Sequence, residues 1–137
     1  RMRVFLDANV IFSAAQKGSP SRRLFEALAR RATLATHPGI WLEAERNLHA
    51  KRPEWLPGLA SLRALLRFSA AMATCPNVGL PPKDQPVLGA AIAARADRLV
   101  TGDRTHFGPL FGKTFQGVRV VCPRAMAEEM RASGWLP

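Results

Sequence analysis

Two polar residues interrupt an apolar segment near the start of the chain, RVFLDANVIF at residues 3–12. The apolar residues at 4–6 and 10–12 form the near-continuous run that is typical of a parallel β-strand covered on both faces. Asp7 and Asn9 break this run. An ionised carboxylate in such a strand is costly unless backbone donors, a basic side chain or a metal ion satisfies it. Asp7 therefore needs a partner, and the other acidic residues decide among these alternatives.

Predicted strands and helices alternate along the chain. Strands are expected at residues 3–7, 32–37, 97–103 and 118–122. Helices are expected at 19–31, 39–51, 57–73, 83–96 and 123–133, and residues 75–82 are expected to form a loop or a short edge segment. This alternation predicts an α/β fold with a parallel sheet and helices on both faces. The 137 residues, 47% of them hydrophobic, are expected to form one domain over 1–137.

Charge indicates the class of partner. The chain has 20 Lys and Arg against 10 Asp and Glu, a formal net charge of +10, which favours a polyanion and above all nucleic acid. No apolar run reaches the roughly 18 residues of a membrane span, and no signal-peptide pattern is present. We therefore expect a soluble, cytoplasmic protein without a membrane partner. Cys75 and Cys122 are far apart in sequence, which favours reduced thiols over a disulfide.

Three acidic residues are predicted to meet at one edge of the sheet. Asp7 and Asp103 stand at the carboxyl ends of their strands, the edge at which α/β sheets bind ligands. Asp84, at the start of the helix expected at 83–96, can reach the same edge. Clustered carboxylates repel each other unless a cation lies among them, and Mg²⁺ and Mn²⁺ prefer oxygen ligands. The pattern predicts a divalent-metal site; the structural alternatives are Asp84 as a helix N-cap and Asp103 as a turn residue.

Four segments occur in an order that is typical of a known family. They are FLDANVIFSA, LEAERNL, KDQPVLGAAIAARADRLVTGDRTHFGPLFG and GVRVVCPRAM, and they run over nearly the whole chain. In these segments the chain resembles the PIN-domain family of metal-dependent nucleases, which includes VapC-type toxins. The resemblance implies a three-layer α/β/α sandwich around a mainly parallel sheet, with an acidic pocket that binds Mg²⁺ or Mn²⁺ and cleaves RNA.

The resemblance also implies roles for individual residues. The acids that match the family's catalytic metal ligands are Asp7, Glu43, Asp84 and Asp103, with Asn9 and Thr101 as supporting residues. Ala8 stands where many members carry Thr, which removes a hydroxyl group but no metal ligand. The basic residues that neighbour these acids in sequence, and that we expect to hold RNA, are Arg46, Lys83 and Arg104.

Periodicity and resemblance disagree about the middle acid. Ala44 and Leu48 belong to the apolar face of the helix expected at 39–51; Glu45 lies at the edge of that face, and Glu43 points nearly opposite. Periodicity alone favours Glu45, whereas the family pattern selects Glu43. We favour Glu43, because a metal pocket at the edge of the sheet is reached from the flank of the packed face.

These observations together predict a Mg²⁺- or Mn²⁺-dependent endoribonuclease that hydrolyses RNA phosphodiester bonds, with the toxin of a toxin–antitoxin pair as a candidate role. RNA, an antitoxin protein and a second copy of the chain are the candidate partners. The alternative is a catalytically idle RNA-binding or interaction domain on the same fold. A receiver-like or phosphatase-like domain is disfavoured, because it would carry a second acid where this chain has Ala8 or Asn9.

Overall fold

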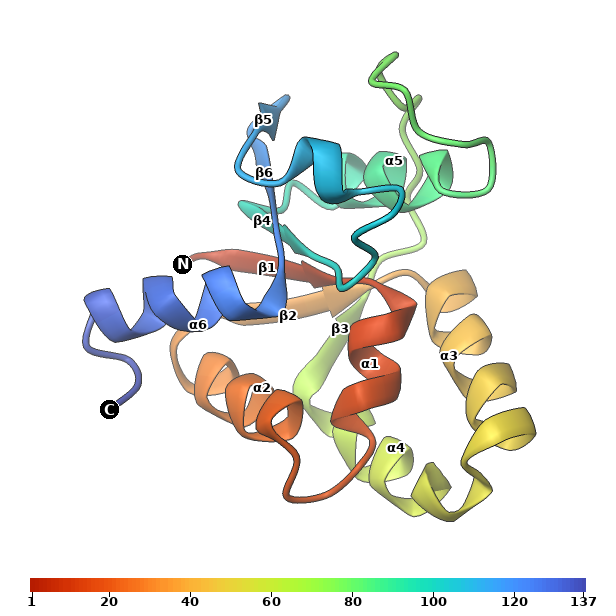
Figure 1. Cartoon of the computed structure of the whole chain (residues 1–137), viewed down its shortest axis with the longest axis vertical. Helices are drawn as coiled ribbons and strands as arrows, with labels where there is room; N and C mark the ends of the chain where they lie inside the picture. The colour runs from red at the N-terminus through yellow and green to blue at the C-terminus, as the bar shows by residue number, and fades with distance from the viewer.

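A six-stranded sheet forms the centre of the computed structural model, which describes residues 1–137 (Figure 1). The strand order is β3-β2-β1-β4-β6-β5. All neighbouring strands pair in parallel except β5, which is antiparallel to β6. The strands are β1 (Arg3–Leu6), β2 (Thr33–Thr36), β3 (Leu66–Phe68), β4 (Arg98–Val100), β5 (Thr114–Phe115) and β6 (Val118–Val121).

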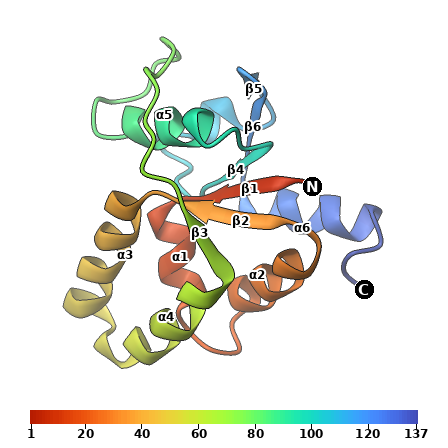
Figure 2. The ribbon, with the colours of Figure 1, turned by 180° about the vertical axis from the view of Figure 1, so that it is seen from behind.

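Helices cover both faces of this sheet. They are α1 (Ala8–Ala14), α2 (Pro20–Arg31), α3 (Pro38–Lys51), α4 (Leu56–Leu62), α5 (Gln85–Ala93) and α6 (Pro123–Ala132), with short 3₁₀ turns at Pro53–Trp55, Arg63–Leu65 and Gly108–Leu110. α5 lies on one side of the sheet, and the other helices gather on the opposite side (Figures 1 and 2). The predicted α/β/α sandwich with a mainly parallel sheet is thus confirmed. None of the helices has the length and apolar character that crossing a membrane requires.

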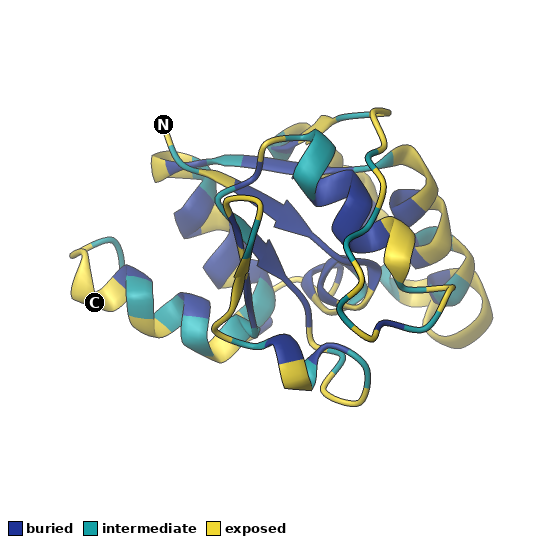
Figure 3. Cartoon of the chain, turned by 90° about the horizontal axis from the view of Figure 1, so that it is seen from above, coloured by how far each residue is buried: buried dark blue, intermediate teal, exposed yellow.

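The strands are buried because they are apolar on both faces. Val4, Phe5 and Leu6 of β1 have no exposed surface, and neither do Leu99 and Val100 of the neighbouring β4. Figure 3 shows the central strands buried in the middle of the molecule, with most of the exposed residues in loops and on the outer sides of the helices. Burial of this apolar surface, at about 25 cal/mol per Å², is the main stabilising contribution to the fold.

The first strand is shorter than the apolar run that predicts it. β1 ends at Leu6, and residues 10–12 belong to α1 rather than to a strand. Asp7 is the N-cap of α1: its backbone is extended, and its Oδ1 accepts a hydrogen bond of 2.7 Å from the amide of Ala8. A side chain that satisfies a free amide at a helix start favours a helix here. Asp7 therefore lies at the junction of a strand and a helix.

The helix predicted at 57–73 is wrong in its second half. α4 ends at Leu62, and after a 3₁₀ turn Leu66–Phe68 form β3, an edge strand parallel to β2. The Phe68 ring contacts Trp41 of α3 edge-on, with centroids 5.5 Å apart. Pairing with β2 overrides the helical spacing of the leucines in this segment. The remaining strands are one to four residues shorter than predicted, and β5 was not predicted.

The topology places a crevice between β1 and β4. β2 and then β3 follow along one edge of β1, and the chain then crosses over to β4, which pairs with the opposite edge of β1. Helices on opposite faces leave a gap at the point where the strand order reverses, at the carboxyl ends of the strands. Asp7 follows β1 directly and Thr101 follows β4 directly. The fold thus brings residues far apart in sequence to one crevice.

Candidate active site

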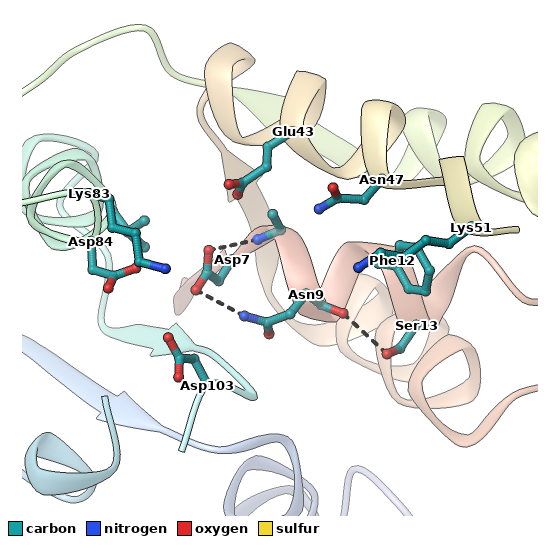
Figure 4. Close-up of a pocket in the computed structure, with 12 residues that line it drawn as sticks. Asp7, Asn9, Phe12, Ser13, Glu43, Asn47, Lys51, Lys83, Asp84 and Asp103 are labelled. Carbon is teal, nitrogen blue, oxygen red and sulfur yellow. Dashed lines mark hydrogen bonds between the residues drawn. The ribbon is translucent and has the colours of Figure 1, made fainter. Parts of the chain in front are cut away.

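A cavity of about 450 Å³ opens at this crevice (Figure 4). Four parts of the chain line it: the start of α1, one side of α3, the start of α5 and the turn after β4. The lining residues are Asp7, Ala8, Asn9, Phe12, Ser13, Glu43, Asn47, Lys51, Lys83, Asp84, Val87 and Asp103. All four predicted acids are among them, so residues separated by up to 96 positions in sequence share one cavity.

Asp7 is the most deeply buried of these acids, with 5% of its surface exposed. Its Oδ2 accepts hydrogen bonds from the Thr101 hydroxyl at 2.8 Å and from the Asn9 amide at 3.2 Å, and its Oδ1 accepts from Ala8. Burial raises the pKa of Asp7, as does the nearby charge of Glu43, while the three hydrogen bonds oppose the increase. A carboxylate whose charge is poorly solvated in this way has a reason to bind a cation.

Asn9 and Thr101 hold the two strand ends together. The Asn9 amide group donates to Thr101 Oγ1 at 3.3 Å, and Asn9 Oδ1 accepts from the Gly102 amide at 2.7 Å. Thr101 Oγ1 also accepts from the Asp103 amide at 3.2 Å. Thr101 is fully buried, so its hydroxyl group is shared among protein atoms alone. Both predicted supporting residues therefore contact Asp7 and fix the backbone that carries Asp103.

Asp103 and Asp84 converge on His106. His106 Nδ1 lies 2.9 Å from Asp103 Oδ2, and the His106 amide donates to Asp103 Oδ1 at 3.1 Å. Partial burial alone would raise the pKa of Asp103, but the hydrogen bonds from His106 and the charge of its ring lower it below the usual value. The sequence analysis did not include His106 in the site. Its spacing three residues after Asp103, within a turn, is the signal that could have identified it.

Asp84 retains an unsatisfied oxygen atom. His106 Nδ1 also lies 3.2 Å from Asp84 Oδ2. This contact is not a hydrogen bond, because a ring nitrogen has at most one proton and the Asp103 contact is shorter. Asp84 Oδ2 is therefore buried without a hydrogen-bond partner. The side chain does not cap α5 either, so the interpretation of Asp84 as an ordinary N-cap is wrong.

The donor set fits a divalent cation. Asp84, Asp103 and His106 each offer one ligand atom, and these three atoms all lie within 4.8 Å of one another. Asp7 and Glu43 line the same cavity and bring further carboxylate oxygens, the ligands that hard cations prefer. A cation would satisfy the orphaned oxygen of Asp84 and offset the repulsion between Asp7 and Glu43.

One side of α3 faces the cavity. Glu43, Asn47 and Lys51 line it at intervals of four residues, the spacing that places side chains above one another on a helix. Glu45 is half-buried and is not among the lining residues. The structure thus brings Glu43 to the cavity from the flank of the packed face. Asn47 and Lys51 were missed by the sequence analysis, although their four-residue spacing from Glu43 was available as a signal.

The three basic residues predicted to hold RNA have different positions. Lys83 lines the cavity beside Asp84. Arg46 is exposed on α3 but does not line the cavity. At about 100° per residue it lies on the opposite side of Glu43 from Asn47 and Lys51. Arg104 is exposed on the turn after Asp103 and is also outside the lining. Only Lys83 is therefore in direct reach of a ligand in the cavity.

Comparisons with known proteins agree with this fold. The family model of the PIN domain matches residues 3–105. Among solved structures, the chain is similar to a chain of VapBC2 from Rickettsia felis, solved bound to a DNA fragment from the promoter, with a TM-score of 0.65 and 18% sequence identity. That similarity covers 88% of this chain and 98% of the other. No curated protein sequence matches the chain.

Proposed function

The chain belongs to the PIN-domain family, and we propose that it is a divalent-metal-dependent ribonuclease that hydrolyses phosphodiester bonds in RNA. The observation that carries the proposal is the set of four carboxylates, from four separate parts of the chain, that line one cavity at the switch point of the sheet: Asp7, Glu43, Asp84 and Asp103. A net charge of +10 on the whole chain supports a polyanionic substrate.

The proposed cofactor is Mg²⁺ or Mn²⁺. Asp7, Glu43, Asp84 and Asp103 would hold it, and a bound ion of this kind lowers the pKa of water and offsets the charge of a phosphodiester. Thr101 and Asn9 orient Asp7 through their hydrogen bonds, and His106 fixes the orientation of Asp103. Lys83, which lines the cavity beside Asp84, would contact a phosphate oxygen.

A toxin–antitoxin pair is the proposed biological context. The family includes VapC-type toxins, and the solved neighbour is a VapBC2 complex bound to promoter DNA. On this basis we propose that the chain is a toxin whose partner is an antitoxin protein. A small DNA-binding reading frame directly upstream of its gene would support this context. Co-purification of the two products as one complex would test it, and independent elution of both would count against it.

The nuclease proposal is tested by incubating single-stranded RNA with the protein in chelator, and then with Mg²⁺ or Mn²⁺ added back. We expect no cleavage in chelator and recovery with the metal, because four carboxylates without a cation would repel the phosphodiester. Asp103→Asn should abolish cleavage. Asp97→Asn is the matched control: it removes the same charge from a residue whose Oδ2 accepts from the Arg3 amide, away from the cavity.

Two outcomes would reject the proposal. Cleavage that survives in chelator would exclude a role for metal. RNA binding without cleavage in any divalent metal would favour the alternative, a catalytically idle RNA-binding domain.

A further inference from the structure

The cavity has two chemically different ends. Figure 4 shows the carboxylates at one end, and Phe12, Ser13, Asn47 and Lys51 at the other, where α1 faces α3. The acidic end is accounted for by the proposed metal site. The other end presents an aromatic ring, an amide and an ammonium group, none of which is a usual ligand for Mg²⁺ or Mn²⁺.

The volume of the cavity exceeds the need of the metal site. The cavity holds about 450 Å³, which lies in the usual range of pockets for small molecules rather than of a site for a single ion. Its lining extends from the carboxylates to Lys51. The cavity therefore has room for a part of the substrate beside the metal.

Two polar groups at this end have no partner in the protein. The amide of Asn9 is fully used by Asp7, Thr101 and Gly102. By contrast, no hydrogen bond joins Asn47 or Lys51 to the residues around them in Figure 4. None of the ion pairs of the protein includes Lys51. These two groups are therefore available to a ligand.

Phe12 offers a fixed aromatic surface beside them. Its ring packs edge-on against Trp55, with centroids 5.6 Å apart and an interplanar angle of 64°. The side chain is half-buried and lines the cavity. Aromatic side chains that bind single-stranded RNA contact the faces of unpaired bases, and stacking of this kind contributes about 1–3 kcal/mol per base.

We propose that this end of the cavity is a nucleotide subsite, which binds the nucleotide next to the cleaved phosphodiester in single-stranded RNA. Phe12 contacts the base, the Asn47 amide offers a donor and an acceptor to the edge of the base, and Lys51 binds the adjacent phosphate. The subsite rests on the proposed nuclease function, because it assigns the remainder of the same cavity to the substrate. It makes Phe12 and Asn47 determinants of the cleavage sequence.

Binding of a fluorescein-labelled, single-stranded RNA octamer of mixed sequence tests this subsite. It is measured by anisotropy in Ca²⁺, with the RNA checked for integrity; if Ca²⁺ supports cleavage, KM replaces the dissociation constant. Phe12→Leu keeps an apolar side chain against Trp55 but removes the π-face, and we expect affinity to fall at least fivefold. Lys51→Ala should weaken binding and reduce the slope of log affinity against log salt by about 0.7, the value for one phosphate contact on a single strand.

Lys113→Ala is the matched control. Lys113 is an exposed lysine outside the cavity, so its loss should change affinity less than twofold. In Mn²⁺, Asn47→Ala should also broaden the distribution of cleavage sites on a randomised RNA.

The outcomes separate this inference from the nuclease proposal. If Lys51→Ala binds RNA like the parent, with an unchanged salt slope, the subsite is rejected. Because Lys51 is exposed, this substitution should leave the packing of the core unchanged. If the parent cleaves RNA but Phe12→Leu and Lys51→Ala bind it as the parent does, the subsite alone is rejected. Binding that weakens as expected, in a parent that never cleaves with Mn²⁺, would reject the nuclease proposal and keep the subsite.

Discussion

Thr101 is the residue whose replacement best tests how the site is held together. Its buried hydroxyl group donates to Asp7 Oδ2 at 2.8 Å and accepts from the Asp103 amide at 3.2 Å. Thr101→Val keeps the shape of the side chain but removes these two bonds and the longer bond of 3.3 Å from the Asn9 amide. We therefore expect a stable fold with a weakened site, and a loss of stability that the hydrogen bonds alone account for.

The size of this loss is set mainly by the two shorter bonds, to Asp7 and from the Asp103 amide. A hydrogen bond to an ionised group contributes about 1.5–3 kcal/mol, and a neutral one about 0.5–1.5 kcal/mol. Thr101→Val should therefore lower the free energy of unfolding by roughly 3 kcal/mol. With an unfolding entropy of about 2.1 cal/mol/K per residue over 137 residues, this corresponds to a decrease in Tm of about 10 °C.

Thermal unfolding of the metal-free protein at pH 7, followed by circular dichroism, measures this loss. Thr101→Ser is the control, because it keeps the hydroxyl group and loses only a methyl group, at a cost of about 1 kcal/mol. The difference between Thr101→Val and the parent should shrink on acidification, because burial raises the pKa of Asp7 and the protonated acid needs no charged bond. Equal Tm values for the Val and Ser variants would refute the assigned role of the hydroxyl group.

Three other variants probe the acids themselves. Burial raises the pKa of Asp7, so the stability contributed by its protonated form is fully present below 3.8 and is lost as the pH rises through the raised pKa. Asp7→Asn stays neutral, so its free energy of unfolding at pH 7 should exceed that of the metal-free parent by about 1.4 kcal/mol for each unit by which the Asp7 pKa is raised. The difference in unfolding free energy should disappear near pH 3.8. Glu43→Gln should weaken Mn²⁺ binding, measured by titration calorimetry, and abolish cleavage, whereas Glu45→Gln should leave both within a few-fold of the parent. A dead Glu45→Gln variant would move the proposed ligand by two residues.

The strands of the sheet could be predicted where they are buried on both faces. β1, β4 and β6 are apolar on both sides, and runs of this kind have few other stable environments. β3 was not predictable in this way, since only Leu66 of its three residues is buried and the segment also has helical spacing. An edge strand depends on pairing with its neighbour, which is a property of the tertiary fold.

The residues of the candidate site also differ in how far they could be predicted. Asp7 and Asp103 could be predicted to meet, because the carboxyl ends of parallel strands share an edge whatever the loops do. Asn47 and Lys51 follow Glu43 at four-residue spacing, which could have indicated them once Glu43 was selected. The rotation of α3 that turns this side toward the cavity could not be predicted, because the apolar pattern of one helix gives only its packed face. His106 was missed for a related reason: its contact with Asp84 needs the start of α5 to lie against the turn after β4.

The charge of the cavity explains why metal and substrate should bind together. Its lining contains four acids and two lysines, a formal charge of −2, in a chain whose net charge is +10. The surface therefore attracts a polyanion that the empty cavity repels. One divalent cation would neutralise the lining, and RNA and the cation should then favour each other's binding by the same factor, as linkage requires. Lys51, at the end of the cavity away from the acids, allows the neighbouring phosphate to be held without opposing that cation.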